Sequence, residues 1–442
     1  MTLLFIENRY KTYFFEPIAQ QLKFEGHDIH WLIQNKQFLP SKEFNNYIVD
    51  YPKSNLNYEE IDYVEKVIFS DRQINHFNKK DKSYFYYYNT KIEELIKIIE
   101  PDVVFGESTA FHELLTIENC KRLNILYLNP STCRYPVGRF SFYKYDTLEP
   151  YSGSGEELGD EMAKEIINQI VNRKAIPNYM APIKTSRAAI IKDKIKKTLA
   201  YCRGETYNTP NPLIKYRLEK KKKDNIVRWN KSALQVVEEA EAFKILYPLQ
   251  MQPEANIDVW GRPYRNQTQL IEDISKALPP NTLLYVKPNP KSKYELGQDL
   301  IHFIENNSNI RALHHTTKMD EVLPLVDLVI TVTGTIAIEC ILSNKPVATL
   351  VETINNRARN CRFIHDIMLD IPKIVSIISE NEFPRLTDEE KVEYINLLNR
   401  TSFKGLVSDP LSDINCISEE NITNLVLAFS EVFKKLKTES KF

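Results

Sequence analysis

The segment between Leu328 and Leu350 limits the possible folds of this chain more than any other. Its apolar, β-branched start at Leu328–Val332 is typical of a strand buried on both faces of a sheet. Thr333-Gly334-Thr335 then breaks the run with turn and N-cap residues, and Ile336–Ser343 has the composition of a packed helix. Val347–Leu350 is the next strand. This order predicts a crossover unit of a parallel α/β sheet.

The turn Thr333-Gly334-Thr335 also carries the groups that bind a phosphate. Two hydroxyls, unpaired backbone N–H groups and the positive end of the following helix meet at this point. Glu339 lies four residues after Thr335, so it projects from the same helix face one turn deeper, where a carboxylate can accept hydrogen bonds from ribose hydroxyls. The alternative is a capped crossover helix whose Glu339 faces solvent.

Length and composition exclude several classes of protein. A chain of 442 residues predicts two or three domains, and 43% hydrophobic with 26% charged residues is ordinary for a globular protein. A net charge of −1 gives no overall field for nucleic acid. No window has the roughly 18 apolar residues of a membrane span. The N-terminus does not begin with positively charged residues and has an acidic residue, Glu7, near its start, so we do not expect a signal peptide.

The six cysteines are widely scattered and form no C-x-x-C pair. This distribution favours reduced thiols in a cytoplasm and argues against a cysteine zinc site. We therefore expect a cytoplasmic protein.

The first 150 residues alternate strands and helices, which predicts a second parallel sheet. The strand Leu3–Ile6, the helix Phe14–Lys23 and the strand Ile29–Ile33 form its first βαβ unit. Polar residues follow later strands: Glu107 and Ser108 come after the strand 102–105, and 129–132 close the next one. Ligands bind beyond the carboxyl ends of such strands, so these residues are site candidates.

Four regions follow from this pattern. We predict an N-terminal Rossmann-like domain at 1–150, a helical basic connector at 151–240, a C-terminal Rossmann-like domain at 241–420 and a final helix at 421–442. The connector contains the lysine-rich segment 190–203 and the run Lys220–Lys223. It is either a solvated link or a surface that touches anionic lipid or an anionic glycan, with peripheral contact to the inner membrane as the consequence.

Three motifs of the C-terminal half resemble the bacterial capsule polysaccharide glycosyltransferases that use CMP-activated keto-sugar acids. These are the Kdo transferases and the relatives that transfer sialic-acid-like nonulosonates. The motifs are YPLQMQPEA at 247–255, LYVKPNP at 284–290 and ITVTGTIAIECILSNKPV at 330–347. The resemblance is good over 243–350 and extends to the first 150 residues as a pattern of elements.

The resemblance implies a GT-B fold of class α/β, with two Rossmann-like domains whose parallel sheets face a central cleft. It implies a glycosyltransferase that moves a keto-sugar acid from a CMP donor to a growing surface polysaccharide, with a glycan or lipid-linked oligosaccharide as acceptor. The expected donor-binding residues are Glu254, Lys287, Asn289, Thr333, Gly334, Thr335 and Glu339. Asn289 stands where the family often has histidine, and an amide can donate a hydrogen bond but carries no charge.

Residue chemistry agrees with such a donor. One helix terminus and one cation, for which Lys287 is the candidate, can stabilise a single phosphate without a metal. The chain has no Walker loop and no Asp-x-Asp between strands. We therefore expect no metal and no cofactor beyond the nucleotide sugar.

The acceptor side needs a base or a nucleophile. Glu107 is the first candidate and His112 the second, although either could be an ordinary helix residue. The aromatic and basic run 134–143 offers rings that stack on sugars and guanidinium groups that pair with carboxylates. From this region we expect Arg134 and Arg139, together with Ser131, to bind the acceptor or a sugar carboxylate; an irregular surface loop is the alternative.

Three other functions stay open at this point. A non-enzymatic polysaccharide-binding module is one, although it would make no use of a helix start of the nucleotide-binding type. The other two are enzymes. One is a UDP-sugar-dependent transferase. The other is a UDP-sugar epimerase of the same fold, for which His314, His315 and His365 would be the candidate groups.

Overall fold

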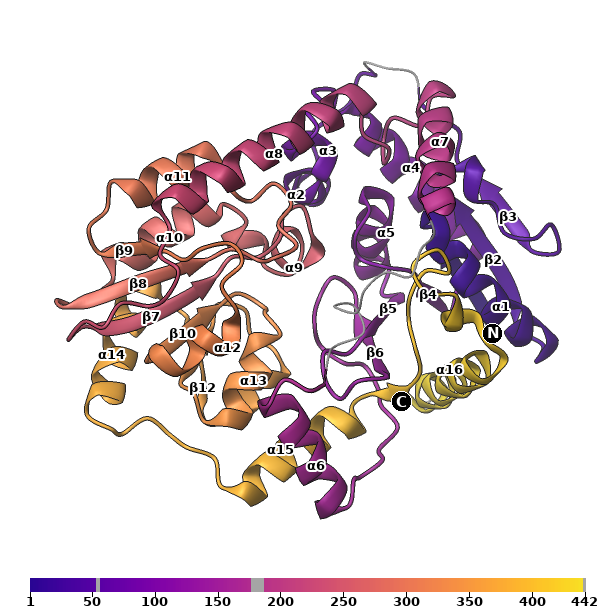
Figure 1. Ribbon diagram of the computed structural model, residues 1–442. Coiled ribbons are helices and arrows are strands. Elements are labelled where there is room, and N and C mark those ends of the chain that lie inside the picture. The colour runs from indigo at the N-terminus through magenta and orange to yellow at the C-terminus, as the bar shows by residue number, and fades with distance from the viewer. Residues whose placement is uncertain (53–55, 176–186, 440–442) are drawn as a thin grey trace. The chain divides into compact units, whose positions relative to one another are not determined.

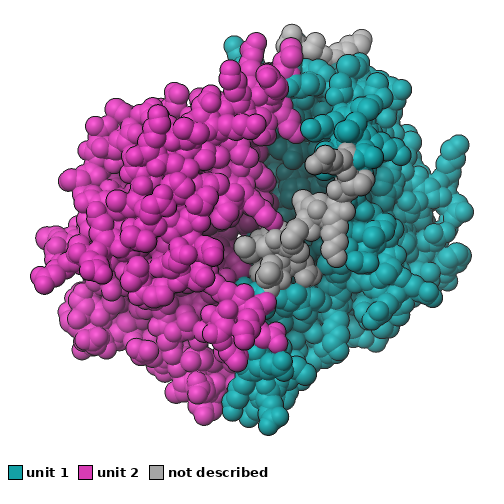
Figure 2. Space-filling view, viewed as in Figure 1, with its two compact units in different colours: residues 1–166, 175–212, 395–442 teal, residues 167–174, 213–394 magenta. Residues whose placement is uncertain are grey.

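The computed structural model describes residues 1–52, 56–175 and 187–439. The chain forms two compact units, coloured separately in Figure 2. Unit 1 comprises 1–166, 175–212 and 395–442, and unit 2 comprises 167–174 and 213–394. The division departs from the predicted ranges. The segment 151–240 is shared between the units, and 395–420 belongs with the N-terminal half.

Unit 1 is built on a mixed sheet with the strand order β13-β6-β5-β4-β1-β2-β3 (Figure 1). The strands from β5 to β3 are parallel, whereas β6 pairs antiparallel with β5 and β13 pairs antiparallel with β6. Its strands are β1 (Thr2–Ile6), β2 (Asp28–Ile33), β3 (Asn45–Ile48), β4 (Val103–Phe105), β5 (Leu126–Thr132), β6 (Arg139–Lys144) and β13 (Phe403–Lys404). Its helices are α1 (Thr12–Phe24), α2 (Asp62–Ser70), α3 (Arg72–Asn75), α4 (Ser83–Ile99), α5 (Phe111–Arg122), α7 (Arg187–Cys202) and α16 (Glu419–Glu439).

Helices α1 and α16 pack together over one face of this sheet. Phe5 of β1 lies in the resulting core and stacks on Trp31 and Phe429, with ring centroids 5.2 and 6.4 Å apart. Leu4 and Ile6 point to the other face and are also fully buried. A sheet covered on both faces explains the continuous apolar run of β1. The expected C-terminal helix therefore exists as α16, and it completes the core of unit 1.

Unit 2 contains a parallel sheet with the strand order β12-β11-β10-β7-β8-β9. Its strands are β7 (Phe243–Pro248), β8 (Thr282–Lys287), β9 (Ile310–Ala312), β10 (Leu328–Thr331), β11 (Val347–Thr349) and β12 (Cys361–Phe363). Its helices are α8 (Pro212–Ser232), α9 (Ala255–Asp258), α10 (Gln267–Lys276), α11 (Gln298–Glu305), α12 (Met319–Val322), α13 (Ile336–Ser343) and α14 (Ile367–Ser379). Two further helices, α6 (Asp160–Val171) and α15 (Asp388–Arg400), are divided between the units, and α8 has its first residue, Pro212, in unit 1.

Counted within each unit, both sheets follow the order 3-2-1-4-5-6 of a Rossmann fold. The predicted fold class is confirmed: the chain is α/β and has two Rossmann-like domains, as GT-B enzymes do. The central cleft between the two sheets stays a prediction. Each sheet reverses its strand order once, between β1 and β4 in unit 1 and between β7 and β10 in unit 2. The crevice beyond the carboxyl ends at such a reversal is where open α/β sheets bind ligands.

The region 129–143 differs from the prediction. Residues 129–132 do not close a strand with a loop, because β5 continues through them and turns back into β6. Phe140 and Phe142 alternate inward along β6 and are fully buried, with the Phe142 ring 4.9 Å from Phe429. These rings belong to the core, so they cannot stack on a sugar. Among the described helices, none is long and apolar enough to cross a bilayer.

Candidate functional site

The candidate site of unit 2 lies at the carboxyl edge of its sheet. Parallel pairing puts Lys287 of β8 opposite Pro248 of β7, and Thr331 of β10 opposite Thr349 of β11. The loops that leave these strands therefore start at one edge. Of the seven predicted donor-binding residues, Lys287 is the last residue of β8, and the other six stand in these loops or on the helix that follows β10.

The turn after β10 is tightly packed. The backbone N–H of Gly334 donates to Oγ1 of Thr331 at 3.2 Å, and Oγ1 of Thr333 donates to the carbonyl of Asn256 at 3.2 Å. A Cβ on Gly334 would lie 2.6 Å from Thr331 Oγ1 and 3.4 Å from Nε2 of Gln250. Only glycine fits here without displacing the turn, which then leads into α13 at the predicted residue, Ile336.

Lys287 is a buried cation at this edge. Its relative exposure is 2%, and within the described residues the only hydrogen bond of its ammonium goes to the carbonyl of Pro288, at 3.1 Å. Burial first, and the nearby positive charge of Arg173 second, lower the pKa of Lys287 to about 8. A buried ammonium with unfilled donor capacity is costly unless an anion completes its shell.

Arg173 reaches the same edge from a distant part of the sequence. It follows α6 with a left-handed backbone, φ 54°, which is uncommon for a residue other than glycine. Its guanidinium pairs with the carboxylate of Glu339 on α13 at 2.5 Å. Arg173 and Lys287 together supply two positive charges beside one carboxylate. An anionic group carried by a ligand would therefore be favoured here.

His315 and Asn289 lie next to Lys287. The His315 ring hydrogen-bonds to the backbone of Asn289, and its buried Nε2 has no hydrogen-bond partner among the residues that the structure describes. Burial first, and the charge of Lys287 second, lower the pKa of His315, so the imidazole is neutral at pH 7. The side chain of Asn289 accepts the N–H of Lys291 at 2.8 Å and thereby shapes the loop after β8.

Glu254 is placed by the loop after β7. It precedes α9, donates its backbone N–H to Asp258 at 3.0 Å, and pairs through its carboxylate with Lys293 at 3.3 Å. Since Asn256 of α9 contacts Thr333, this loop adjoins the Thr-Gly-Thr turn. The sequence therefore predicted correctly that these groups share one edge; their role in binding stays a prediction.

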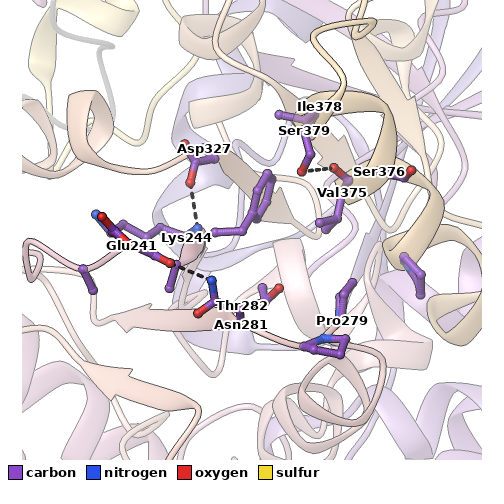
Figure 3. A pocket seen from close by; sticks show the side chains of 15 residues that line it. Glu241, Lys244, Pro279, Asn281, Thr282, Asp327, Val375, Ser376, Ile378 and Ser379 are labelled. Carbon is purple, nitrogen blue, oxygen red and sulfur yellow. Dashed lines mark hydrogen bonds between the residues drawn. The ribbon is translucent and has the colours of Figure 1, made fainter.

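A pocket of about 740 Å³ opens at the opposite, amino edge of the same sheet (Figure 3). Its wall includes the start of β7, where the backbone N–H of Lys244 donates to Asp327 at 2.7 Å. It contains none of the predicted site residues. Because ligands of parallel α/β sheets bind at the carboxyl edge, we do not assign the candidate site to this pocket.

In unit 1 the end of β4 carries a partly exposed carboxylate, Glu107. Its side chain is 26% exposed, pairs with Lys11 at 3.0 Å and accepts a hydrogen bond from Nδ2 of Asn8 at 3.2 Å. Asn8 and Lys11 follow β1, the strand beside β4. Glu107 thus stands at the strand reversal of unit 1, where a ligand of this unit is expected.

Glu113, a residue that the sequence did not suggest, holds this loop in place. Its fully buried carboxylate accepts the backbone N–H groups of Glu107 at 2.9 Å, Thr109 at 3.2 Å and Ala110 at 2.9 Å, and the amide of Asn8 at 3.0 Å. Burial and the neighbouring Glu107 raise the pKa of Glu113 to about 7. Glu113 is therefore the acid that caps α5, which leaves the carboxylate of Glu107 for Lys11 and for a ligand.

His112 is buried within a polar network rather than facing solvent. Its Nε2 contacts the carbonyl of Glu7 at 2.6 Å, and its Nδ1 contacts Nδ2 of Asn208 at 3.1 Å. Burial lowers its pKa to about 4, so the ring is neutral. Both ring nitrogens are engaged. This geometry favours a structural role for His112 over the predicted catalytic one.

The predicted carboxylate-binding residues lie along the β5–β6 hairpin. Ser131 pairs with Ser141 across the two strands, and Arg134 is half-buried in the turn between them. Arg139 is buried and binds Glu156 at 3.2 Å, Ser154 Oγ at 2.9 Å and the carbonyl of Ser402 at 2.7 Å. The guanidinium of Arg139 holds chain segments together, so a sugar carboxylate would have to displace Glu156.

Two functional candidates escaped the sequence reasoning for different reasons. Glu113 had a signal, since an acid in the first turn of a helix is a common cap. Arg173 had none, because its approach to Glu339 depends on a turn after α6 and on the packing of unit 2.

No protein-family model matches the sequence, and a search among curated proteins found no match. Among solved structures, the chain is similar to KpsC, a beta Kdo 2,7 transferase of Thermosulfurimonas dismutans, with 12% identity, TM-score 0.37, and 97% of this chain and 99% of that chain covered. It is also similar to the UDP-GlcNAc 2-epimerase of Methanocaldococcus jannaschii, with 15% identity, TM-score 0.28, and 90% and 99% covered. A putative epimerase of Listeria monocytogenes gives 13% identity, TM-score 0.27, and 98% and 97% covered.

Proposed function

We propose that the protein is a glycosyltransferase that binds a nucleotide sugar in unit 2 and activates an acceptor hydroxyl in unit 1. The observation that carries the proposal is the buried ammonium of Lys287 at the carboxyl end of β8, the strand next to the β7–β10 reversal of a Rossmann sheet. A phosphate there would accept hydrogen bonds from Lys287 and from the N–H groups at the start of α13. The carboxylate of Glu339 would bind the ribose hydroxyls once Arg173 releases it.

The donor we propose is a CMP-linked keto-sugar acid. Such a donor carries one phosphate and one sugar carboxylate, and the edge offers Lys287 and Arg173 as their two counter-charges. The motifs 247–255, 284–290 and 330–347 support the same donor class. The acceptor would be a growing surface polysaccharide or a lipid-linked oligosaccharide.

For the first prediction, CMP should bind the protein more tightly than UDP, and transfer should persist in EDTA. The physical reason is that two side-chain cations and a helix terminus match one phosphate and one carboxylate without needing a divalent ion. Isothermal titration with CMP and UDP, and a transfer assay with and without EDTA, measure both expectations. Tighter binding of UDP, or activity that is lost in EDTA and restored by a divalent ion, would instead support a UDP-sugar transferase.

A second prediction concerns Gly334. Gly334→Val should lower CMP affinity at least tenfold, because the side chain would occupy the space where phosphate approaches the backbone. The new Cβ also collides with the hydroxyl of Thr331, so Thr331→Ala provides the matched background. Calorimetry on Thr331→Ala with and without Gly334→Val separates the two effects. CMP binding that is equal in both proteins would place the phosphate elsewhere.

A UDP-sugar epimerase is the second candidate, and His315 is the observation that favours it. The neutral imidazole lies beside Lys287, and its buried Nε2 makes no hydrogen bond within the described part of the chain, so it could move a proton on a bound sugar. An epimerase converts its sugar nucleotide without an acceptor. Incubation of UDP-GlcNAc with the protein alone, followed by NMR for a second sugar, distinguishes it from a transferase.

A further inference from the structure

Helix α7 (Arg187–Cys202) is part of unit 1 (Figure 1), and some of its described side chains contact the rest of that unit. The ammonium of Lys196 lies over the ring of Phe38, 3.9 Å from its centroid, and also near the rings of Tyr10 and Tyr13. Ala200, one turn further, is 2% exposed. The inner face of α7 is therefore fixed against the loops that follow β1 and β2.

The outer face of α7 carries an apolar stripe. Ile191, Ile195 and Leu199 follow each other at intervals of four residues, so they line up along one side of the helix. Their exposures are 58%, 55% and 47%, and Ile190 beside them is 43% exposed. Single exposed apolar side chains are ordinary on protein surfaces, but a row of them on one helix marks a contact surface.

The charges on α7 are arranged around this stripe. Lys192 and Lys194 are exposed and flank it on opposite sides. Asp193, the acid of this helix, is turned inward: its side chain is 14% exposed and pairs with Lys197 at 2.7 Å. Among the described side chains of α7, every exposed one is thus apolar, cationic or a small uncharged group.

We propose that the outer face of α7 docks on an anionic lipid surface. A helix with an apolar stripe between lysines lies in the plane of a bilayer, with its apolar side chains among the acyl chains and its lysines at the phosphates. An anionic glycan could pair with Lys192 and Lys194, but it would leave the stripe in water. The stripe therefore favours a membrane over a glycan. This inference is independent of the proposed enzymatic function.

Flotation of the full chain with vesicles tests the proposal. Phosphatidylcholine vesicles with about one third phosphatidylglycerol should carry the protein, and pure phosphatidylcholine vesicles should carry much less. Ile191→Asp/Ile195→Asp should weaken the partition at least tenfold, because it removes apolar burial and adds repelling charge. Lys192→Gln/Lys194→Gln should weaken it on anionic vesicles only, and salt at about 0.5 M should do the same.

Leu427→Asp is the matched control, since Leu427 of α16 is 61% exposed in the same unit and lies outside the stripe. It should float like the parent. The proposal is overturned if Leu427→Asp loses as much binding as the stripe variant, or if neutral and anionic vesicles bind equally. It is also overturned if the stripe variant turns a dimer into a monomer in light scattering, because a second copy would then cover the face. Binding to a soluble polyanion, with no binding to vesicles, would identify a glycan surface instead.

Discussion

Lys287→Met is expected to weaken nucleotide binding strongly and, at the same time, to make the ligand-free protein more stable. Methionine keeps the length and apolar stem of the side chain and removes the ammonium. Losing a charge-assisted hydrogen bond to phosphate should lower nucleotide affinity about a hundredfold. Removing a buried charge with one carbonyl partner should stabilise the fold by about 1–3 kcal/mol at pH 7.

The pH dependence of stability and of nucleotide affinity tests the same prediction in a second way. Because the pKa of Lys287 falls from 10.5 to about 8 in the folded protein, the unfolded chain binds more protons between these values. The parent should therefore gain stability as pH rises from 8 to 10.5, relative to Lys287→Met. Nucleotide affinity should move the opposite way and decline as pH rises through 8, since the free site loses its proton.

Calorimetric titration with CMP and thermal unfolding at several pH values provide the measurements. Lys276→Met is the control, because Lys276 is exposed in the same unit and pairs with Glu272 at 2.6 Å. Lys276→Met should change CMP affinity and the pH dependence of stability by only a small amount. If Lys287→Met binds CMP like the parent, or if it melts earlier by several degrees, Lys287 is a structural residue and the phosphate site is wrong.

Glu107→Gln is expected to lower transfer about 10²- to 10⁴-fold with little change in donor affinity, as for the loss of a placed base. The amide keeps the shape of the side chain and can still accept from Asn8, but it cannot take a proton from a sugar hydroxyl. The donor groups are in unit 2, so CMP binding should persist. Turnover and CMP titration on the same preparation separate catalysis from binding.

Glu149→Gln is the control for the loss of a Glu–Lys pair, since Glu149 pairs with Lys144 at 2.8 Å in the same unit. Near-parental turnover of Glu107→Gln would refute the assignment of Glu107 as the base. An unfolded Glu107→Gln would show that the pair with Lys11 is structural; Lys11→Met then serves as the second variant. A folded, active Lys11→Met beside an inactive Glu107→Gln would still identify Glu107 as the base.

The sequence was most informative where one strand leads into one helix. The segment 328–350 predicted β10, α13 and β11 to within two residues, because the β-branched run, the Thr-Gly-Thr turn and the apolar helix each have a local signal. Lys287 and Glu107 were found in the same way, as polar residues directly at strand ends. Parallel strands end at a common edge, so local signals were enough to gather these residues.

The sequence signal failed where packing between distant segments decides which side chains are buried or already paired. Phe140 and Phe142 alternate as strand residues do, but the neighbouring arginines suggested a sugar platform instead of a core. Arg139 looked available to a ligand because its partners leave no signal near it in the sequence. Ser154 lies in a loop, and Ser402 lies far along the chain. Strand β13 has two residues and leaves no pattern of its own.

The C-terminal segment 395–442 has a consequence for the order in which the chain can fold. It supplies β13 and α16 to unit 1, and α16 covers strands made from the first residues of the chain. During synthesis, the strands β1 to β6 leave the ribosome first, but their core is incomplete until α16 has been made. The long segment 213–394 of unit 2 is complete earlier. Although chains tend to fold from the N-terminus as they emerge, the second unit of this protein can reach its native core while the first still exposes an apolar face.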